Sequence, residues 1–154
     1  MDTSERSPGR RTRLGIAVLA LLNALSAVGG GVSLILGYLS VGPELTARLP
    51  WGSAVVGGVA LLLCVAVPNA ALGVLALRND DRVAAAAVVV GLVLVGWILV
   101  ELAFIRELSF FHPLYVGIGL VLILLGRRLQ HIEGAATGNT APDRRRRTAT
   151  GGVS

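Results

Sequence analysis

The sequence predicts an all-α membrane protein, an antiparallel bundle of four transmembrane helices. Of the 154 residues, 54% are hydrophobic and only 15% are charged, whereas soluble domains are about one quarter charged. The mean hydropathy is +0.75. Charged residues gather between and beyond four apolar segments, each near the roughly 20 residues that a helix needs to cross a bilayer. Four such helices leave no room for a second folded domain.

The first predicted span covers residues 14–41 and follows a basic N-terminal tail, residues 1–13. A basic flank before apolar sequence is also typical of a signal peptide, and the letters ALSA at residues 24–27 resemble a cleavage site. The apolar segment continues well beyond those letters. We therefore expect a spanning helix that is not cleaved.

The other three predicted spans are separated by polar sequence and cover residues 51–77, 83–105 and 109–126. A short charged turn, residues 78–82, joins two of them, and Pro68 interrupts the span before that turn. Residues 129–154 include four consecutive arginines and show no apolar periodicity. This composition predicts a disordered, arginine-rich C-terminal tail.

The distribution of arginine predicts the orientation of the chain. Residues 1–13 hold four arginines, the turn at 78–82 holds two and residues 127–154 hold six, whereas the other two loops hold only Arg48 and Arg106. Basic residues favour the cytoplasmic side of a membrane, so we expect a multi-pass plasma-membrane protein with both termini in the cytoplasm. The net charge of +5 then needs no nucleic-acid partner. The tail either contacts anionic lipid or only enforces orientation.

Asn23 and Asn69 are uncharged polar residues within the first and second spans. Each lies about eight or nine residues from the cytoplasmic end of its helix, so we expect both at similar depth. Two amides in hydrocarbon are expected to hydrogen-bond to each other across a helix interface. A polar cavity lining is the alternative, because Pro68 frees a backbone carbonyl one turn earlier.

Small residues recur four positions apart within the predicted spans. This spacing predicts close helix packing, within the chain or between copies, because van der Waals contact holds helices together in lipid. The sets are Ala20 with Ala24, Gly29 with Ser33 and Gly37, Ala54 with Gly58, and Ala87 with Gly91.

Ionisable groups gather around the loop between the third and fourth spans, where Glu101, Arg106, Glu107 and His112 occur. Glu101 lies about one turn inside the membrane, and such groups are costly there unless they are paired or functional. We expect it to pair with Arg106 or His112. The cluster is either a structural clasp or a site for a proton, a cation or a ligand.

Two aromatic side chains flank this cluster, Trp97 on the third span and Tyr115 on the fourth. All seven aromatic residues of the chain fall toward the half of the membrane opposite the predicted cytoplasmic side. This one-sided distribution indicates either a ligand or lipid pocket in that half, or an inner interface anchored by arginine alone.

Metal and enzyme chemistry find little support in the sequence. The chain has two histidines and one cysteine, Cys64, which lies in an apolar segment and can form no disulfide within the chain. Nucleophile-elbow, phosphate-loop, HExxH and CxxC motifs are all missing. We therefore predict no metal, no cofactor and no catalytic residue, and an enzymatic role stays open.

Two sequence stretches carry a resemblance to known families: LPWGSAVVGG at residues 49–58, and VGWILVELAFIRELSFFHPLYVGIGLVLILLG at residues 95–126. They resemble small four-span membrane proteins of unknown function from high-GC Gram-positive bacteria. A more distant resemblance is to the DoxX-like family, some members of which are linked to quinone or thiol redox chemistry. The charged residue that this family carries early in its first helix has no counterpart here. Neither resemblance implies a functional residue.

Taken together, these features predict an accessory or structural membrane protein that packs with itself or with a membrane partner. A small carrier or ligand-binding protein that uses the cluster around Glu101 is the alternative. A DoxX-like redox-associated protein is the third interpretation.

Overall fold

The computed structural model describes residues 8–39, 53–105 and 111–138. These residues form helices α1 (Pro8–Ile35), α3 (Ala54–Leu61), the π-helix η2 (Leu62–Ala66), α4 (Val67–Leu77), α5 (Val83–Ile105) and α6 (Phe111–Gly138). Elements α3, η2 and α4 follow one another without a break. The result is four helical segments of 21 to 28 residues that are long and apolar enough to cross a membrane. The predicted all-α, four-span architecture is confirmed.

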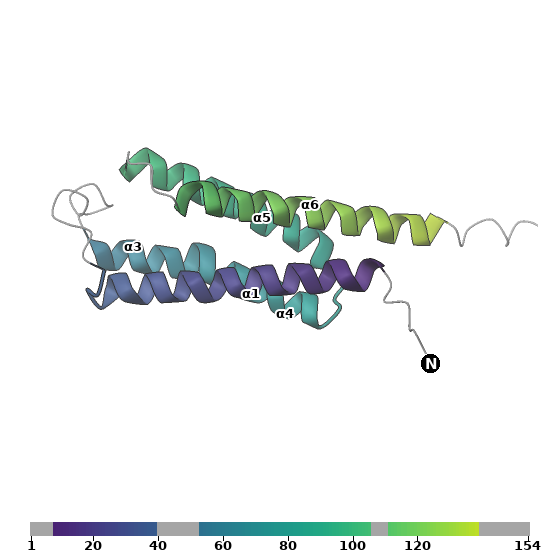
Figure 1. Ribbon diagram of the computed structural model, residues 1–154, viewed down its shortest axis with the longest axis horizontal. Coiled ribbons are helices and arrows are strands. Elements are labelled where there is room, and N and C mark those ends of the chain that lie inside the picture. Colours follow the sequence, from purple (N-terminus) through teal and green to yellow (C-terminus); the bar gives the residue numbers. More distant parts are fainter. Residues whose placement is uncertain (1–7, 40–52, 106–110, 139–154) are drawn as a thin grey trace, which may run out of the picture.

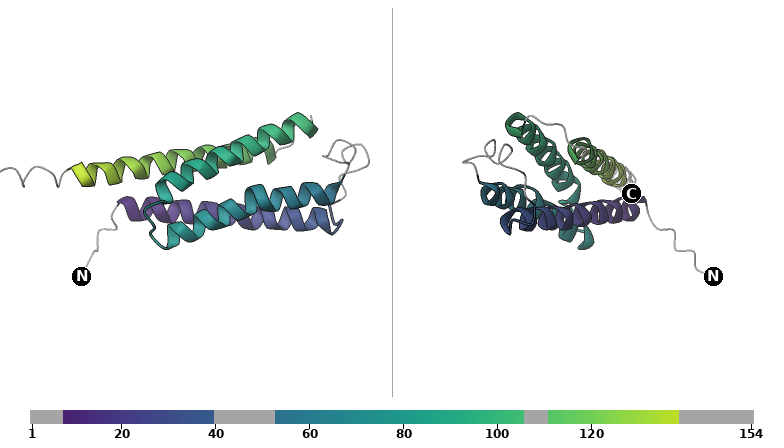
Figure 2. Two further views of the ribbon diagram at one scale, coloured as in Figure 1. Left: turned by 180° about the vertical axis from the view of Figure 1, so that it is seen from behind. Right: turned by 60° about the vertical axis from the view of Figure 1, so that its left-hand side comes forward.

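The four segments form two antiparallel hairpins, α1 with α3, η2 and α4, and α5 with α6 (Figure 1). We call one end of the bundle the arginine end, because it holds the start of α1, the turn at residues 78–82 and the last turns of α6. The opposite end is the loop end. The hairpins lie close together at the arginine end and diverge toward the loop end (Figure 2).

Glycine lets backbones touch at the main helix contacts. A Cβ atom at Gly91 of α5 would lie 2.6 Å from the carbonyl oxygen of Gly119 in α6, and a Cβ at Gly58 would lie 2.7 Å from the carbonyl oxygen of Gly31. Real side chains do not fit at these distances, so both helix pairs are in backbone contact. The predicted close packing is confirmed at Gly58 and Gly91.

The predicted small-residue face of Gly29, Ser33 and Gly37 is not a packing face within the chain. Gly29 has no neighbour within 4 Å of the position its Cβ would occupy.

Gly37 adopts a left-handed backbone, with φ of +75°, and the Leu39 N–H donates to the Ser33 carbonyl at 3.2 Å. A glycine in this conformation ends a helix. The expected end at residue 41 is therefore wrong, because α1 ends at Ile35.

The helix α1 also begins earlier than expected, at Pro8 rather than residue 14. Proline is favoured at the first helical position, where its fixed φ suits the helix and its missing N–H is not needed. The Thr12 hydroxyl donates to the Pro8 carbonyl at 3.0 Å within this first turn. Residues 8–13 of the predicted polar tail are thus helical.

The helix α6 continues to Gly138, well beyond the predicted end at residue 126. Leu129 is fully buried, and a Cβ at Gly9 of α1 would lie 3.9 Å from Ile132 Cγ2. The expected disordered tail is therefore wrong for residues 129–138, because these apolar side chains keep a packing partner after the hydrocarbon-length segment ends. Residues 139–154, with the four consecutive arginines, lie outside the described residues.

The π-helix η2 lies just before Pro68, as expected for a proline inside a span. Proline lacks an N–H and its ring clashes with the carbonyl four residues earlier, which disturbs a regular α-helix. Here the turn widens, and the Val67 N–H donates to the Leu62 carbonyl, five residues back. The span continues without a break in its helical path.

Buried apolar side chains form two clusters along the bundle. The larger, the arginine-end cluster, consists of Ile16, Ala17, Ala20, Leu72, Ala76, Val83, Ala84, Ala87, Val90, Leu122 and Leu129. The smaller, the central cluster, consists of Ala27, Val65, Ala66 and Leu94. All four spans contribute to the first cluster, so the hairpins are joined mainly there.

Candidate functional site

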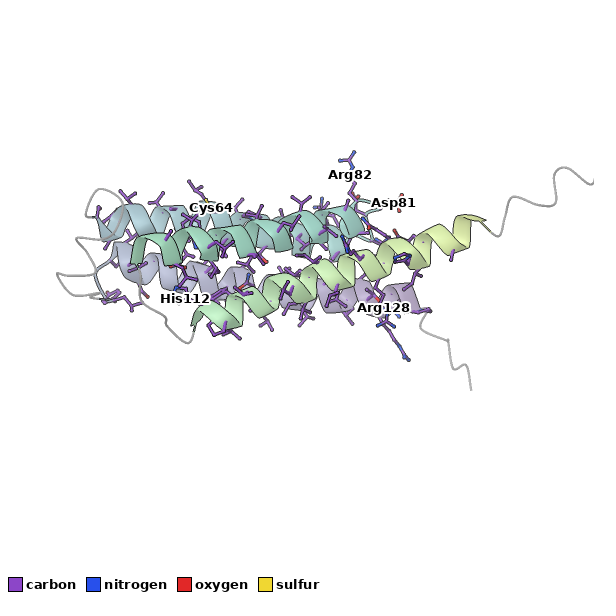
Figure 3. All side chains as sticks on the ribbon, turned by 90° about the horizontal axis from the view of Figure 1, so that it is seen from above. Cys64, Asp81, Arg82, His112 and Arg128 are labelled. Atoms are coloured by element: carbon purple, nitrogen blue, oxygen red, sulfur yellow. The ribbon has the colours of Figure 1, made fainter. Side chains whose placement is uncertain are left out.

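The structure brings together two of the ionisable residues singled out in the sequence. Glu101 is half-buried near the end of α5, and His112 is buried at the start of α6, with 7% of its surface exposed. The two side chains interact electrostatically across the α5–α6 hairpin. Figure 3 shows His112 toward the end of the bundle opposite Arg82. Arg106, the other predicted partner, and Glu107 lie outside the described residues.

Trp97 and Tyr115 both pack against the central cluster. The Trp97 ring is half-buried and its Nε1 atom is buried. The Tyr115 hydroxyl lies 3.1 Å from the Ser26 Oγ of α1, a hydrogen bond in which either group can donate. This contact joins the two hairpins on the loop-end side. Ser26 cannot be identified from the sequence, because a lone serine in an apolar span gives no signal of its partner.

Asn23 and Asn69 are both buried in the bundle, with 3% and 1% of their surfaces exposed. The Asn69 Nδ2 donates to the Val65 carbonyl of its own span at 2.9 Å. Within the described part of the chain, neither polar atom of the Asn23 side chain has a hydrogen-bond partner. The predicted hydrogen bond between the two amides is therefore wrong, because the carbonyl near the π-helix takes the Asn69 donor instead.

The two asparagines nevertheless lie at a similar level, as predicted. A Cβ at Gly73 would lie 2.6 Å from the Leu21 side chain, and Gly58 contacts Gly31 further along the same antiparallel pair. Asn23 lies on α1 between Leu21 and Gly31, so its level along the antiparallel pair falls between Gly73 and Gly58, near the first turn of α4. That turn holds Asn69.

A polar clasp closes the arginine end. The Arg13 Nη2 contacts the Glu133 Oε1 at 2.5 Å, and the Arg13 Nη1 donates to the Asp80 carbonyl oxygen at 2.6 Å. One side chain thus joins α1, the α4–α5 turn and α6. Sequence reasoning missed this clasp because it assigned Glu133 to a disordered tail.

Exposed arginines surround this clasp. Arg82 and Arg128 lie on different sides of the same end of the bundle (Figure 3). Such a surface suits anionic lipid headgroups at a membrane interface. The exposed arginines of the described residues are Arg10, Arg11, Arg78, Arg82, Arg127 and Arg128.

The described residues offer little for metal chemistry. No group of three His, Cys, Asp or Glu side chains within residues 8–39, 53–105 and 111–138 is close enough to hold an ion. Cys64 lies on the exposed surface of η2, away from His112 (Figure 3).

Comparison with known proteins adds no family. No protein-family model, curated protein or solved structure matches this chain. The resemblances to four-span proteins of high-GC Gram-positive bacteria and to DoxX-like proteins therefore stay predictions. The chain is a four-helix protein with four candidate membrane spans.

Proposed function

We propose that this protein is an accessory membrane protein whose α1 helix contacts a second copy of the chain within the bilayer. The outward face of α1 supports this proposal. It carries a stripe of exposed residues spaced alternately three and four apart, which is the spacing along which two helices interlock side chains. The stripe consists of Gly15, Val18, Leu22, Leu25, Gly29 and Val32.

Two glycines of the stripe carry the argument. Inside the bundle, Gly31 and Gly91 lie where helix backbones touch. Gly15 and Gly29 have no neighbour within 4 Å of a Cβ position, which is also true of Gly96 on α5, but these two lie together in one stripe on a single helix face. Glycine in a helix costs about 0.8–1 kcal/mol relative to alanine, and lipid chains gain nothing from it. Small residues in membrane helices allow backbones to approach. A second α1 helix supplies the missing neighbour.

The experiment is to measure the dimer fraction of the protein in lipid nanodiscs. Gly29→Leu should lower dimer affinity by about tenfold, a loss of about 1.4 kcal/mol. The variant should fold, since the site is open and leucine is a better helix former than glycine. The matched control is Gly96→Leu on α5, where the Cβ position is also open. A monomeric wild type, or equal loss in the control, would contradict the proposal.

The electrostatic interaction of His112 with Glu101 favours a second candidate function, a small carrier or ligand-binding protein. Both residues lie near the loop end, and Trp97 lies one turn from Glu101 on α5. A carboxylate and an imidazole are suited to hold or transfer a proton or a small cation.

We also propose the plasma membrane as the location, with both termini in the cytoplasm. The arginine count supports this orientation, since exposed arginines of the described residues gather at the end that holds the start of α1 and basic residues favour the cytoplasmic side. Anionic lipid is then the expected contact of the arginine end and of the tail beyond residue 138.

A further inference from the structure

A second polar feature lies in the spans between Arg13 and the pair of Glu101 and His112, and it begins one helical turn from Glu101. It consists of Asn23 on α1, Asn69 on α4 and Trp97 on α5. Within the described ranges, four buried side-chain atoms have no hydrogen-bond partner: Asn23 Nδ2, Asn23 Oδ1, Asn69 Oδ1 and Trp97 Nε1. Buried polar atoms are almost always paired with protein or with a bound molecule, so four such atoms require an explanation.

Each of the three residues contacts the central cluster or lies one helical turn from one of its members. Trp97 packs against it, the Asn69 Nδ2 donates to the carbonyl of its member Val65, and Asn23 lies one turn before its member Ala27 on the same helix. The π-helix η2 contributes two residues of the cluster. Single π-helical turns inside α-helices are frequent at binding sites.

The charge of the surroundings limits what this site can take. Between Arg13 and the pair of Glu101 and His112, the described spans contain no Asp, Glu, Lys, Arg or His side chain at this level. A charged molecule would have no counter-charge there, and its desolvation would be unfavourable. The occupant must therefore be neutral.

We propose that Asn23, Asn69 and Trp97 bind a small neutral molecule that both donates and accepts hydrogen bonds, either water or a small amide or alcohol. Asn23 Nδ2 and Trp97 Nε1 are donors, whereas Asn23 Oδ1 and Asn69 Oδ1 are acceptors. One molecule with both kinds of group satisfies donors and acceptors together. The site faces inward from three helices, so the proposal does not depend on self-association through α1.

The indole N–H of Trp97 provides the readout. The full-length protein, labelled with ¹⁵N at tryptophan and placed in lipid nanodiscs, should give two indole signals, and Trp97→Phe identifies the second one. Magnetisation transfer from water to the Trp97 indole proton, without any response to added acetamide, assigns water. A shift of that signal on addition of acetamide assigns a small organic molecule. The absence of both the magnetisation transfer and the acetamide shift would overturn the proposal.

Variants of Asn23 then test whether its amide holds the bound molecule. In Asn23→Leu the water transfer or the acetamide shift should be lost, and the melting temperature should fall because a bound partner is lost with the amide. Asn23→Ser is a milder variant for the same measurement. Leu14→Ala, on the same helix and exposed, is the matched control and should leave the Trp97 signal unchanged. A rise in the melting temperature of Asn23→Leu would show a buried amide without any partner and would overturn the proposal.

Discussion

The arginine end and the loop end of the bundle are built from different interactions. At the arginine end, fully buried leucines such as Leu72, Leu122 and Leu129 from both hairpins meet in one cluster, and Arg13 joins three elements. At the loop end, the described contacts between the hairpins include the hydrogen bond of Tyr115 to Ser26. The helix α3 packs there mainly on its own hairpin.

This difference indicates that the two ends of the bundle have different roles, one in packing and one in presenting polar side chains. An apolar cluster with a polar clasp holds one arrangement, because packed interiors resist small displacements. Polar side chains at the loop end are costly in lipid, and they are retained where they pair or bind something. The larger buried cluster and the Arg13 clasp thus lie at the arginine end, whereas Glu101, His112 and Trp97 lie toward the loop end.

The orientation of the two ends gives the largest expected effect, since a reporter is either active or silent. Reporter fusions at residue 154 and within the turn at 78–82 should report the cytoplasm, and a fusion at residue 44 should report the opposite side. The measurement is paired activity of a cytoplasmic and an extracytoplasmic reporter. A fusion at residue 154 that is active only outside would reverse the assignment of the ends.

The same substitution at two points of α6 compares a position in backbone contact with α5 and an open position nearer the loop end. A Cβ at Gly126 would lie 2.8 Å from the Ala84 carbonyl oxygen, whereas Gly117 has nothing within 4 Å. Gly126→Ala should lower stability by about 1–3 kcal/mol through overpacking, and Gly117→Ala should raise it by up to about 1 kcal/mol through helix propensity. Melting temperatures of both variants in detergent give the comparison. Equal effects would contradict the backbone contact between Gly126 and α5.

The clasp at the arginine end is tested by removing Arg13. Arg13→Ala should lower stability by about 1 kcal/mol, since the ion pair with the one-third-exposed Glu133 is screened by solvent and the hydrogen bond to Asp80 is lost. Arg10→Ala is the matched control, because Arg10 is exposed on the same helix. Thermal unfolding measures both. A control as destabilised as Arg13→Ala would assign the effect to net charge rather than to the clasp.

Glu101 gives the smallest expected effect and separates a clasp from a working site. Glu101→Leu should be less stable than Glu101→Gln by about 1 kcal/mol or less, because the amide can still hydrogen-bond at this half-buried position whereas leucine cannot. Melting curves of both variants provide the test. If Glu101 handles a proton or a cation, Glu101→Gln keeps stability and loses activity. Equal stability of both variants and wild type would show that Glu101 reaches water without a partner.

The sequence was most informative where polarity changes abruptly. The helix α5 begins at Val83 and ends at Ile105 as predicted, because a charged turn precedes it and the apolar stretch fills one membrane thickness. The predicted fourth span ends at residue 126, because the apolar sequence stops at Arg127. The α6 helix continues, because Leu129 and Ile132 extend its packing face. Helix formation does not require apolar sequence, so hydropathy alone gives the span and not the helix end.

The candidate site was predicted only in part, for a similar reason. A polar or ionisable side chain stands out within or beside an apolar span, and this feature identifies Glu101, His112, Asn23 and Asn69 in the sequence. The partners are set by helix rotation and tilt, which residue spacing does not specify. Spacing therefore could not show that the Tyr115 hydroxyl meets Ser26 or that Asn69 donates to its own span.

Self-association through α1 is tested most directly by a cysteine scan in native membranes. In a Cys64→Ser background, single cysteines are placed along α1 and cross-linked with a short reagent. The account predicts dimer formation at the outward positions Leu22, Leu25 and Gly29 and none at the buried Ala24 and Ala27, a pattern with helical periodicity. Cross-linking that is missing at every outward position, or equal at outward and buried ones, would contradict the account.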